Sequence, residues 1–306
     1  MPSHYFRFTR LHRAGRHRSP LLERLLARAS ARMEVADWRE DAFRVVAPAA
    51  ASMPGIAAAA LYADRGAMDG ATVLLATPVH YLAEMSNVRL AGDGVLSLQQ
   101  SEAQLLAVDF NRVWHDAGIR LLAGSRARLF CAFDQPVEVA TEDPEEVCGR
   151  RIENHLPKGA DAPRLRHLAS EIEMWLFEHE VNRIRIAAAA PVINGLWLWG
   201  GGAALTALPP LKGWASGDDP LFGAFDAGAC ASGAAGVVVT AAEPGTDAWR
   251  DLESQWLGAS LAELRSGRIS QLDLSAGRSC FSVSGRWNWR PWRRARPWWE
   301  SFHEGG

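Results

Sequence analysis

The chain has 306 residues, of which 48% are hydrophobic and 22% charged, and its formal net charge is -2. This composition excludes a disordered or fibrous protein, and the length allows one large domain or two smaller ones to bury a core without disulfides or metal. A charge balance so close to zero favours no class of binding partner.

The cysteines are dispersed along the chain and form no C-x-x-C pair, which predicts reduced thiols and therefore a cytoplasmic location. The longest apolar stretches are shorter than the ~20 residues that a membrane-spanning helix needs. The N-terminus lacks the apolar core and cleavage site of a secretory signal. We expect no membrane span. The cysteines are Cys131, Cys148, Cys230 and Cys280.

Residues 1–18 contain five arginines, three histidines and no acidic residue. They predict a flexible basic arm, because chain termini are loose unless they dock. The alternative is an arm that contacts nucleic acid or an acidic partner. Ser19 and Pro20 then begin a helical stripe of apolar residues that extends to Met33.

The stretch from Ile56 to Leu122 contains both kinds of secondary structure. Residues 56–62 fit a strand or a helix equally well. Short apolar runs at 72–76 and 88–90 predict strands, and residues 99–117 predict a helix that ends at Gly118. Residues 119–122 and 127–133 are typical of a hairpin.

An acidic, proline-broken connector at 138–146 precedes the strongest helical pattern of the chain, from Arg164 to about Ala189. This helix leads into a predicted strand, Val192–Trp199, which ends in three consecutive glycines. A buried strand at 236–240, a helix at 246–266, and a terminal hairpin follow; the two arms of that hairpin are 269–274 and 279–284.

Helices that alternate with short apolar strands indicate the α/β class. We predict a mixed sheet flanked by helices, with a C-terminal β-hairpin, in a single domain over residues 19–285. A boundary within that domain is expected near 140–162.

Arginine and tryptophan alternate in the tail, residues 286–306. Such a mixture can stack on nucleobases or lie at a membrane surface. Alternatively, the indoles pack back onto the body of the protein, with arginines over their faces.

The glycine run, Gly200–Gly202, lets backbone N–H groups approach a ligand without obstruction by Cβ atoms, as anion-binding loops do. Its spacing matches neither of the common phosphate-binding glycine motifs. A tight turn beside a sheet edge is the alternative interpretation.

Two stretches together resemble a known family. His179-Glu-Val-Asn182-Arg-Ile-Arg185, followed by Pro191-Val-Ile-Asn194-Gly-Leu-Trp-Leu-Trp-Gly-Gly-Gly202, is similar to the central signature of the regulatory protein RpfE family. Thr77-Pro-Val-His80 resembles that family's upstream motif, so the likeness extends over roughly 60–300. A similar succession, confined to about 175–235, is found in the archaeal-type cofactor-independent phosphoglycerate mutases of the alkaline-phosphatase-like superfamily.

The resemblance to the mutases implies two divalent metals, held by Asp and His clusters, and a serine nucleophile. Their metal-binding start, a strand that runs into an aspartate, has no match in the basic N-terminus, and no histidine occurs between His179 and His303. We therefore predict no catalytic residue, no metal and no cofactor. The expected function is regulatory binding of a small anionic metabolite or of a protein partner. The alternatives are a metal-dependent phosphomutase or phosphatase, and a nucleic-acid-associated protein that uses its arginine-rich ends.

Imidazole, amide and guanidinium groups together supply convergent donors for an anion. His179 also fits a buried core histidine, because it lies on the apolar stripe of its helix, and Asp218-Asp219 fits either a metal site or a solvent-facing loop. The predicted ligand-binding residues are His80, His179, Asn182, Arg185, Asn194, Gly200, Gly201 and Gly202.

Overall fold

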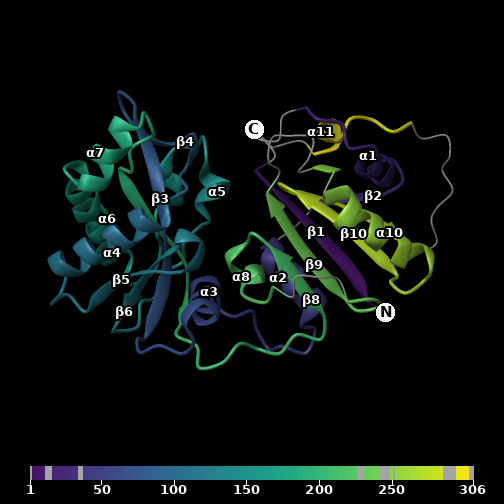
Figure 1. Cartoon of the computed structure of the whole chain (residues 1–306), viewed down its shortest axis with the longest axis horizontal. Coiled ribbons are helices and arrows are strands. Elements are labelled where there is room, and N and C mark those ends of the chain that lie inside the picture. The colour runs from purple at the N-terminus through teal and green to yellow at the C-terminus, as the bar shows by residue number, and fades with distance from the viewer. Residues whose placement is uncertain are drawn as a thin grey trace. The chain divides into compact units, whose positions relative to one another are not determined.

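The computed structural model describes residues 2–10, 16–33, 37–226, 231–241, 249–250, 252–284 and 294–302. The chain forms two compact units, shown in Figure 1. We call Met1–Met53 with Pro209–Gly306 the split unit, and Pro54–Leu208 the inserted unit. This differs from the single domain expected over 19–285, because each unit has its own sheet and core. The boundary expected near 140–162 lies inside the inserted unit.

The split unit is built on a six-stranded mixed sheet with the order β2-β11-β10-β1-β9-β8. Strands β1, β8, β9 and β10 are parallel, whereas β11 is antiparallel to both β10 and β2. The predicted C-terminal hairpin is therefore confirmed as β10 and β11. The strand bounds are β1 Ser3–Thr9, β2 Ser30–Met33, β8 Trp214–Gly217, β9 Gly236–Ala241, β10 Gln271–Ala276 and β11 Ser279–Ser284.

Strand β1 corrects the prediction of a flexible N-terminal arm. It lies between β9 and β10, and Tyr5, Phe6 and Phe8 are buried. A parallel strand in the middle of a sheet is covered on both faces, so burial does not alternate along it, and residues 4–8 are all buried. Arg7 is buried within this run. Among the basic residues that suggested an arm, those at 3–9 therefore belong to the sheet.

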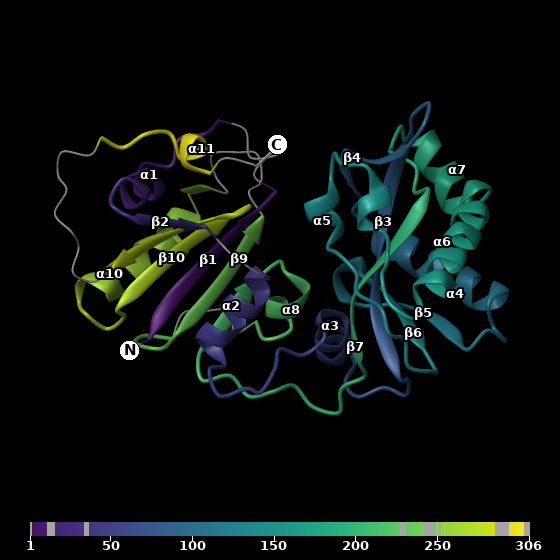
Figure 2. The same cartoon turned by 180° about the vertical axis from the view of Figure 1, so that it is seen from behind.

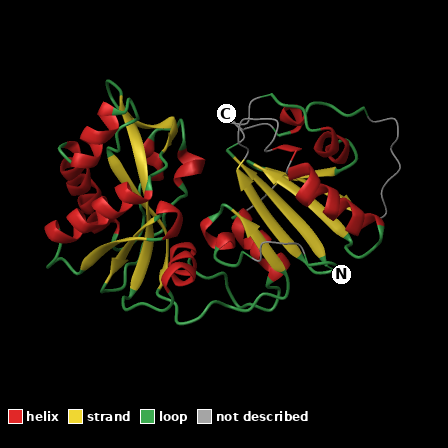
Figure 3. Ribbon diagram, in the orientation of Figure 1, coloured by secondary structure: helices red, strands yellow, loops and turns green. Residues whose placement is uncertain are grey.

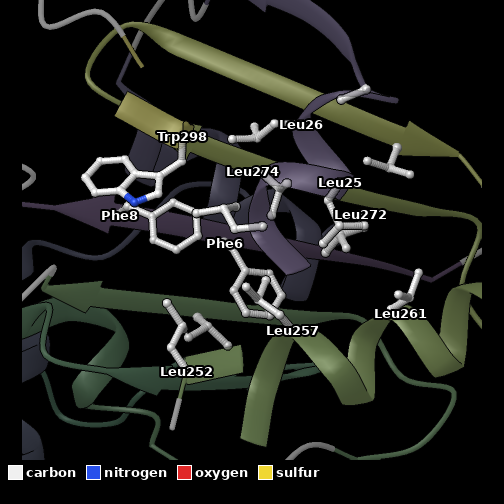
Figure 4. Packing of buried hydrophobic residues seen from close by; sticks show 14 of the residues in the cluster. Phe6, Phe8, Leu25, Leu26, Leu252, Leu257, Leu261, Leu272, Leu274 and Trp298 are labelled. Atoms are coloured by element: carbon white, nitrogen blue, oxygen red, sulfur yellow. The ribbon is translucent and has the colours of Figure 1, made fainter. Parts of the chain in front are cut away.

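Helices cover both faces of this sheet (Figure 1). On one face, Phe6, Phe8 and Leu274 pack against α1, α10 and α11, with Trp298 in the same cluster (Figure 4). On the other face lie α2 and α8. The helical pattern predicted over 21–33 is too long at its end, because residues 30–33 form strand β2. The bounds are α1 Pro20–Leu26, α2 Trp38–Val46, α8 Pro220–Gly223, η4 Leu252–Leu257, α10 Gly258–Arg265 and α11 Trp298–Ser301.

The arginine- and tryptophan-rich tail is described only over residues 294–302. Here Trp298 stacks on Trp249, with ring centroids 5.0 Å apart, and its indole N–H donates to the His17 carbonyl at 2.7 Å. Trp298 therefore packs onto the body of the unit, as one of the two interpretations proposed. Residues 285–293 and 303–306 lie outside the described residues.

The inserted unit contains a five-stranded antiparallel sheet around the long strand β3. Strand β7 pairs along one side of β3, while β6 and β4 pair with successive parts of its other side. The predicted strands at 72–76 and 88–90, and the hairpin of 119–133, are confirmed within these elements. The bounds are β3 Thr72–Ala83, β4 Val88–Val95, β5 Ile119–Ala123, β6 Leu129–Phe133 and β7 Gly195–Ala203.

Helices also cover this sheet (Figures 2 and 3). Leu74, Leu196 and Leu198 share a core with residues of α4, α6 and α7. The next residue of β3, Leu75, points to the opposite face, where it meets α3 beside Gly200. Residues 56–62 are therefore helical. The bounds are α3 Ile56–Arg65, α4 Gln100–Val113, η2 Ser125–Ala127, α5 Pro144–Val147, η3 Ile152–His155, α6 Ala162–Phe177 and α7 Glu180–Ala187.

The long helix predicted over 164–189 is in fact two helices. The backbone of His179 is extended, with φ -68° and ψ 142°, and its side chain caps α7 by accepting a hydrogen bond from the Val181 N–H. A side chain that satisfies a free helix N–H favours a new start at this position. Helix α6 has 16 residues, and within the described ranges no helix combines the length and apolarity that crossing a bilayer requires.

Candidate functional site

Four of the eight predicted site residues gather around the four residues that lead into β7, Pro191–Asn194, which we call the clamp segment. Three side chains bind its backbone, and its last residue binds β3. The groups expected to converge on a ligand thus converge first on this piece of chain. The side chains that reach the backbone of the clamp segment are those of His80, Asn182 and Arg185.

At the clamp segment, the side-chain amides of two asparagines form hydrogen bonds that backbone groups of a neighbouring strand would otherwise form. The buried Asn182 donates to the Ile193 carbonyl at 2.7 Å and accepts from the Ile193 N–H at 2.8 Å. Asn194 does the same to Tyr81, accepting from its N–H at 2.6 Å and donating to its carbonyl at 2.9 Å. Each amide satisfies a donor and an acceptor that would otherwise be costly to leave unpaired.

Arg185 ties the clamp segment to two helices. Its guanidinium donates to both carboxylate oxygens of Glu102, at 2.7 and 3.1 Å, to the Ser97 carbonyl at 2.6 Å and to the Pro191 carbonyl at 3.0 Å. Glu102 also accepts from the Gln99 N–H at the start of α4. Burial raises the pKa of Glu102, but the hydrogen bonds from Arg185 and Gln99 outweigh it and leave the pKa below its ordinary value. The side chains of Arg185 and Glu102 are only 8% and 13% exposed, so this ion pair is largely shielded from solvent.

The hydrogen bond of His80 to the clamp segment uses one nitrogen of its ring. Its Nδ1 lies 2.9 Å from the Val192 carbonyl oxygen. A carbonyl can only accept, so Nδ1 carries the proton, and the neutral ring has its lone pair on Nε2. The ring is partly buried on β3 beside the clamp segment.

His179 has the opposite tautomer and a different role. Its Nδ1 accepts the Val181 N–H at 3.2 Å, so Nε2 carries the proton. Nε2 lies 3.6 Å from Asp109 Oδ2, beyond hydrogen-bond distance, and the ring packs edge-on against Trp175. Burial lowers the pKa of His179, against the smaller opposing effect of Asp109. The structure thus places His179 in the core at the start of α7.

The lowered pKa makes stability depend on pH. Because the folded pKa of His179 lies below its unfolded value near 6.5, the unfolded chain binds more protons, and stability is lost as pH falls below about 6.5 towards the folded pKa. Asparagine also caps helices and does not titrate. We expect His179→Asn to show a smaller fall in melting temperature between pH 8 and pH 5.5 than the wild type.

Differential scanning fluorimetry across this pH range measures the effect. The matched control is His115→Asn, because His115 is exposed. A residual slope is expected in His179→Asn, since burial also lowers the pKa of His4. Equal slopes in the wild type and His179→Asn would contradict the prediction.

The glycines lie away from the clamp segment. Gly200–Gly202 belong to β7 and do not follow its end, and Gly202 pairs with Val73. Gly195 at the start of the strand pairs with Val79, so at 3.3 Å per residue the glycine run is roughly 20 Å from Asn194. A Cβ on Gly202 would lie 2.5 Å from the Cα of Gly55. Here the missing side chain allows the start of α3 to approach the sheet.

The sequence missed a buried charged cluster in the split unit. Arg39 Nε donates to Asp219 Oδ2 at 2.9 Å, and both residues are buried. Arg7 donates to Ser275 Oγ at 2.8 Å, and the guanidiniums of Arg7 and Arg39 lie 4.8 and 4.4 Å from the Trp38 ring centroid. The solvent-facing interpretation is wrong for Asp219, which caps α8. The sequence feature that could have indicated this cluster is Arg7, which lies between Phe6 and Phe8.

These groups lie at or near the carboxyl ends of the parallel strands. Arg7 is near the end of β1, Ser275 near the end of β10, and Asp219 two residues after β8. In open α/β sheets this edge is the usual place for ligands. The described groups at this edge include two guanidiniums, together with a carboxylate that is already hydrogen-bonded to one of them and to two helix N–H groups.

Comparison with known proteins gives a consistent relationship. No family model matches the chain. It is 25% identical over 196 residues to the 2,3-bisphosphoglycerate-independent phosphoglycerate mutase of Methanosarcina mazei, covering 61% of this chain and 49% of the mutase. Against the same enzyme of Methanothrix thermoacetophila it is 39% identical over 61 residues, which is 20% of this chain and 16% of the enzyme. The matches therefore span at most about half the length of these curated relatives.

Two solved structures are also similar. The cofactor-independent phosphoglycerate mutase of Thermoplasma acidophilum covers 92% of this chain at 14% identity and a TM-score of 0.35, and 89% of that protein is matched. The PH0037 protein of Pyrococcus horikoshii covers 96% at 11% identity and a TM-score of 0.39, with 90% of that protein matched. In sequence, the chain is distantly similar to the cofactor-independent phosphoglycerate mutases.

Proposed function

We propose that this protein is a mutase-like regulatory protein of the RpfE-like kind, which binds an anionic small molecule carrying phosphate or carboxylate and does not carry out metal-dependent phosphoryl transfer. The observation that supports this most is the end of β1. The strand is present at the N-terminus, as the resemblance to the mutases requires, but it runs into Thr9-Arg10 where that resemblance implies an aspartate.

The charges around this strand end oppose a two-metal centre. Arg7 and Arg39 bring two guanidiniums to the edge, and a divalent cation placed there would be repelled. Asp219 is occupied by Arg39 and by the start of α8. Within the described ranges, no three His, Cys, Asp or Glu side chains gather as metal ligands do. These contacts of the described residues support the proposal that this edge does not hold the pair of metals that the mutase resemblance implies.

We place the ligand contact at His80, beside the clamp segment. Asn182, Asn194 and Arg185 use their polar atoms to hold this segment, and His80 Nε2 is the atom that remains. An anion at Nε2 needs a proton there, because the first ring proton is held by Val192.

The test uses isothermal titration calorimetry with 3-phosphoglycerate, phosphoenolpyruvate and other phosphorylated or carboxylated metabolites. His80→Asn keeps an N–H in the place of Nδ1–H and removes Nε2. A charge-assisted hydrogen bond contributes about 1.5–3 kcal/mol, so we expect affinity to fall about 10- to 100-fold. The melting temperature should change little.

The control for surface effects is His115→Asn, which should bind like the wild type. No heat of binding with any metabolite, or equal affinity in His80→Asn and the wild type, would contradict the placement of the ligand.

The catalytic alternative is decided separately. The protein is incubated with phosphoglycerate and added Mn²⁺ or Zn²⁺, and the interconversion of the two phosphoglycerates is followed. We expect no metal-dependent turnover. Turnover that requires the added metal would overturn the non-catalytic proposal, whatever the calorimetry shows.

A further inference from the structure

Helix α6 has an outward face that carries large apolar side chains. Its inward residues Leu168, Ile172 and Leu176 are buried in the core of the inserted unit. On the outward side, Met174 is 71% and Phe177 is 84% exposed. Burial of such a side chain contributes about 1.5–3 kcal/mol, so this face favours association with another surface.

The charges on the helix identify what that surface is. On the side of Met174 and Phe177, its first half carries Arg166 and His167 and its second half carries Glu173. Arg164 lies over the Phe133 ring, and His167 is 3.4 Å from Glu171 of the same helix. Two copies of the helix packed in parallel would place like charges together. Packed antiparallel, they place each basic half against the acidic half of the other copy, which is favourable on both sides of a two-fold axis.

A single register satisfies both the charges and the apolar residues. With the two-fold axis at the exposed Ser170, residues equally far from Ser170 lie opposite each other. His167 then faces Glu173 of the second copy, and Arg166 lies within one residue of it. Met174 lies over the aliphatic stem of Arg166, and Phe177 over Pro163. The small serine at the crossing lets the two helices approach closely.

We propose that α6 is a homodimer interface, in which two copies of this chain pack their α6 helices antiparallel across a two-fold axis at Ser170. This inference is independent of the proposed ligand and of catalysis. The partner of the exposed face of α6 is a second copy of this chain, because the basic end of one helix meets the acidic end of the other when the two pack antiparallel.

The first test measures the mass of the full chain by sedimentation equilibrium. The wild type should be a dimer in equilibrium with monomer. Arg166→Glu alone, or Glu173→Arg alone, places like charges opposite each other and should weaken the dimer at least tenfold. The double variant Arg166→Glu/Glu173→Arg restores the complementary pattern and should recover most of the affinity. Thermal melts of the three variants separate a weakened interface from a fold defect, which matters at Glu173 because partial burial raises its pKa.

The second test is oxidative cross-linking. Ser170→Cys places a thiol next to its own symmetry copy, and mild oxidation should give a covalent dimer. Ser101→Cys, at an exposed position of α4, is the control and should stay monomeric on a denaturing gel, as should the parent chain. A wild type that is monomeric at its highest soluble concentration would overturn the proposal. So would a dimer that neither charge reversal weakens.

Discussion

Arg185→Ala is expected to lower the free energy of unfolding by about 3–5 kcal/mol, the usual cost of breaking a buried ion pair by removing one partner. The substitution leaves the Glu102 carboxylate with its Gln99 contact alone, and it leaves the carbonyls of Ser97 and Pro191 without the guanidinium. Chemical denaturation with urea, followed by circular dichroism, measures the loss.

The matched variant is Arg185→Lys. It keeps the charge but cannot reproduce the planar fork that reaches Glu102 and two carbonyls together. We expect a loss smaller than that of alanine but well above the scatter of surface substitutions, which is about 0.5 kcal/mol. If Arg185→Ala were as stable as the wild type, the ion pair would not be the support of the clamp segment.

Gly202→Ala is expected to destabilise the inserted unit by about 1–3 kcal/mol, as overpacking of a close contact does. The new Cβ would lie 2.5 Å from the Cα of Gly55 and 3.1 Å from its nitrogen. Both atoms belong to backbone, so α3 would have to move away from β7. The same denaturation experiment measures the effect.

The control for this substitution is Gly92→Ala on β4, where the new Cβ meets no atom within 4 Å. That variant should lie within about 0.5 kcal/mol of the wild type. Equal effects of the two substitutions would mean that the contact with α3 is not what requires glycine at position 202.

Substitutions that disturb the clamp segment are unsuitable for testing ligand binding. An alanine at Arg185 or Asn194 would release the clamp segment, so a loss of binding in such a variant would report a structural change as much as a lost contact. His80→Asn avoids this difficulty, because it preserves the hydrogen bond to Val192 and changes one ring atom. The choice follows from the hydrogen-bond partners, which a motif does not contain.

Several features could be predicted from sequence because they depend on neighbours along the chain. The hairpin of β10 and β11 needs only two apolar runs and the turn at Ala276-Gly277. The helix α4 is marked by its periodicity and by Gln99 and Glu102, which form a capping box. The mixed sheet with flanking helices follows from the alternation of such elements. The resemblance to phosphoglycerate mutases around Asn182 and Asn194 is supported by the comparison of sequences.

The tertiary structure alone decided what depends on partners distant in sequence. Nothing local in residues 3–9 shows that β9 and β10, more than 220 residues away, will cover both sides of β1. In the same way, the sequence identified His80, Asn182, Arg185 and Asn194 as a group of polar residues. Which atoms bind the clamp segment, and which ring nitrogen of His80 does so, is set by the packing of α4, α7 and β3. Hydrogen bonds are directional and short, so their partners are defined only once the folded chain has brought these elements together.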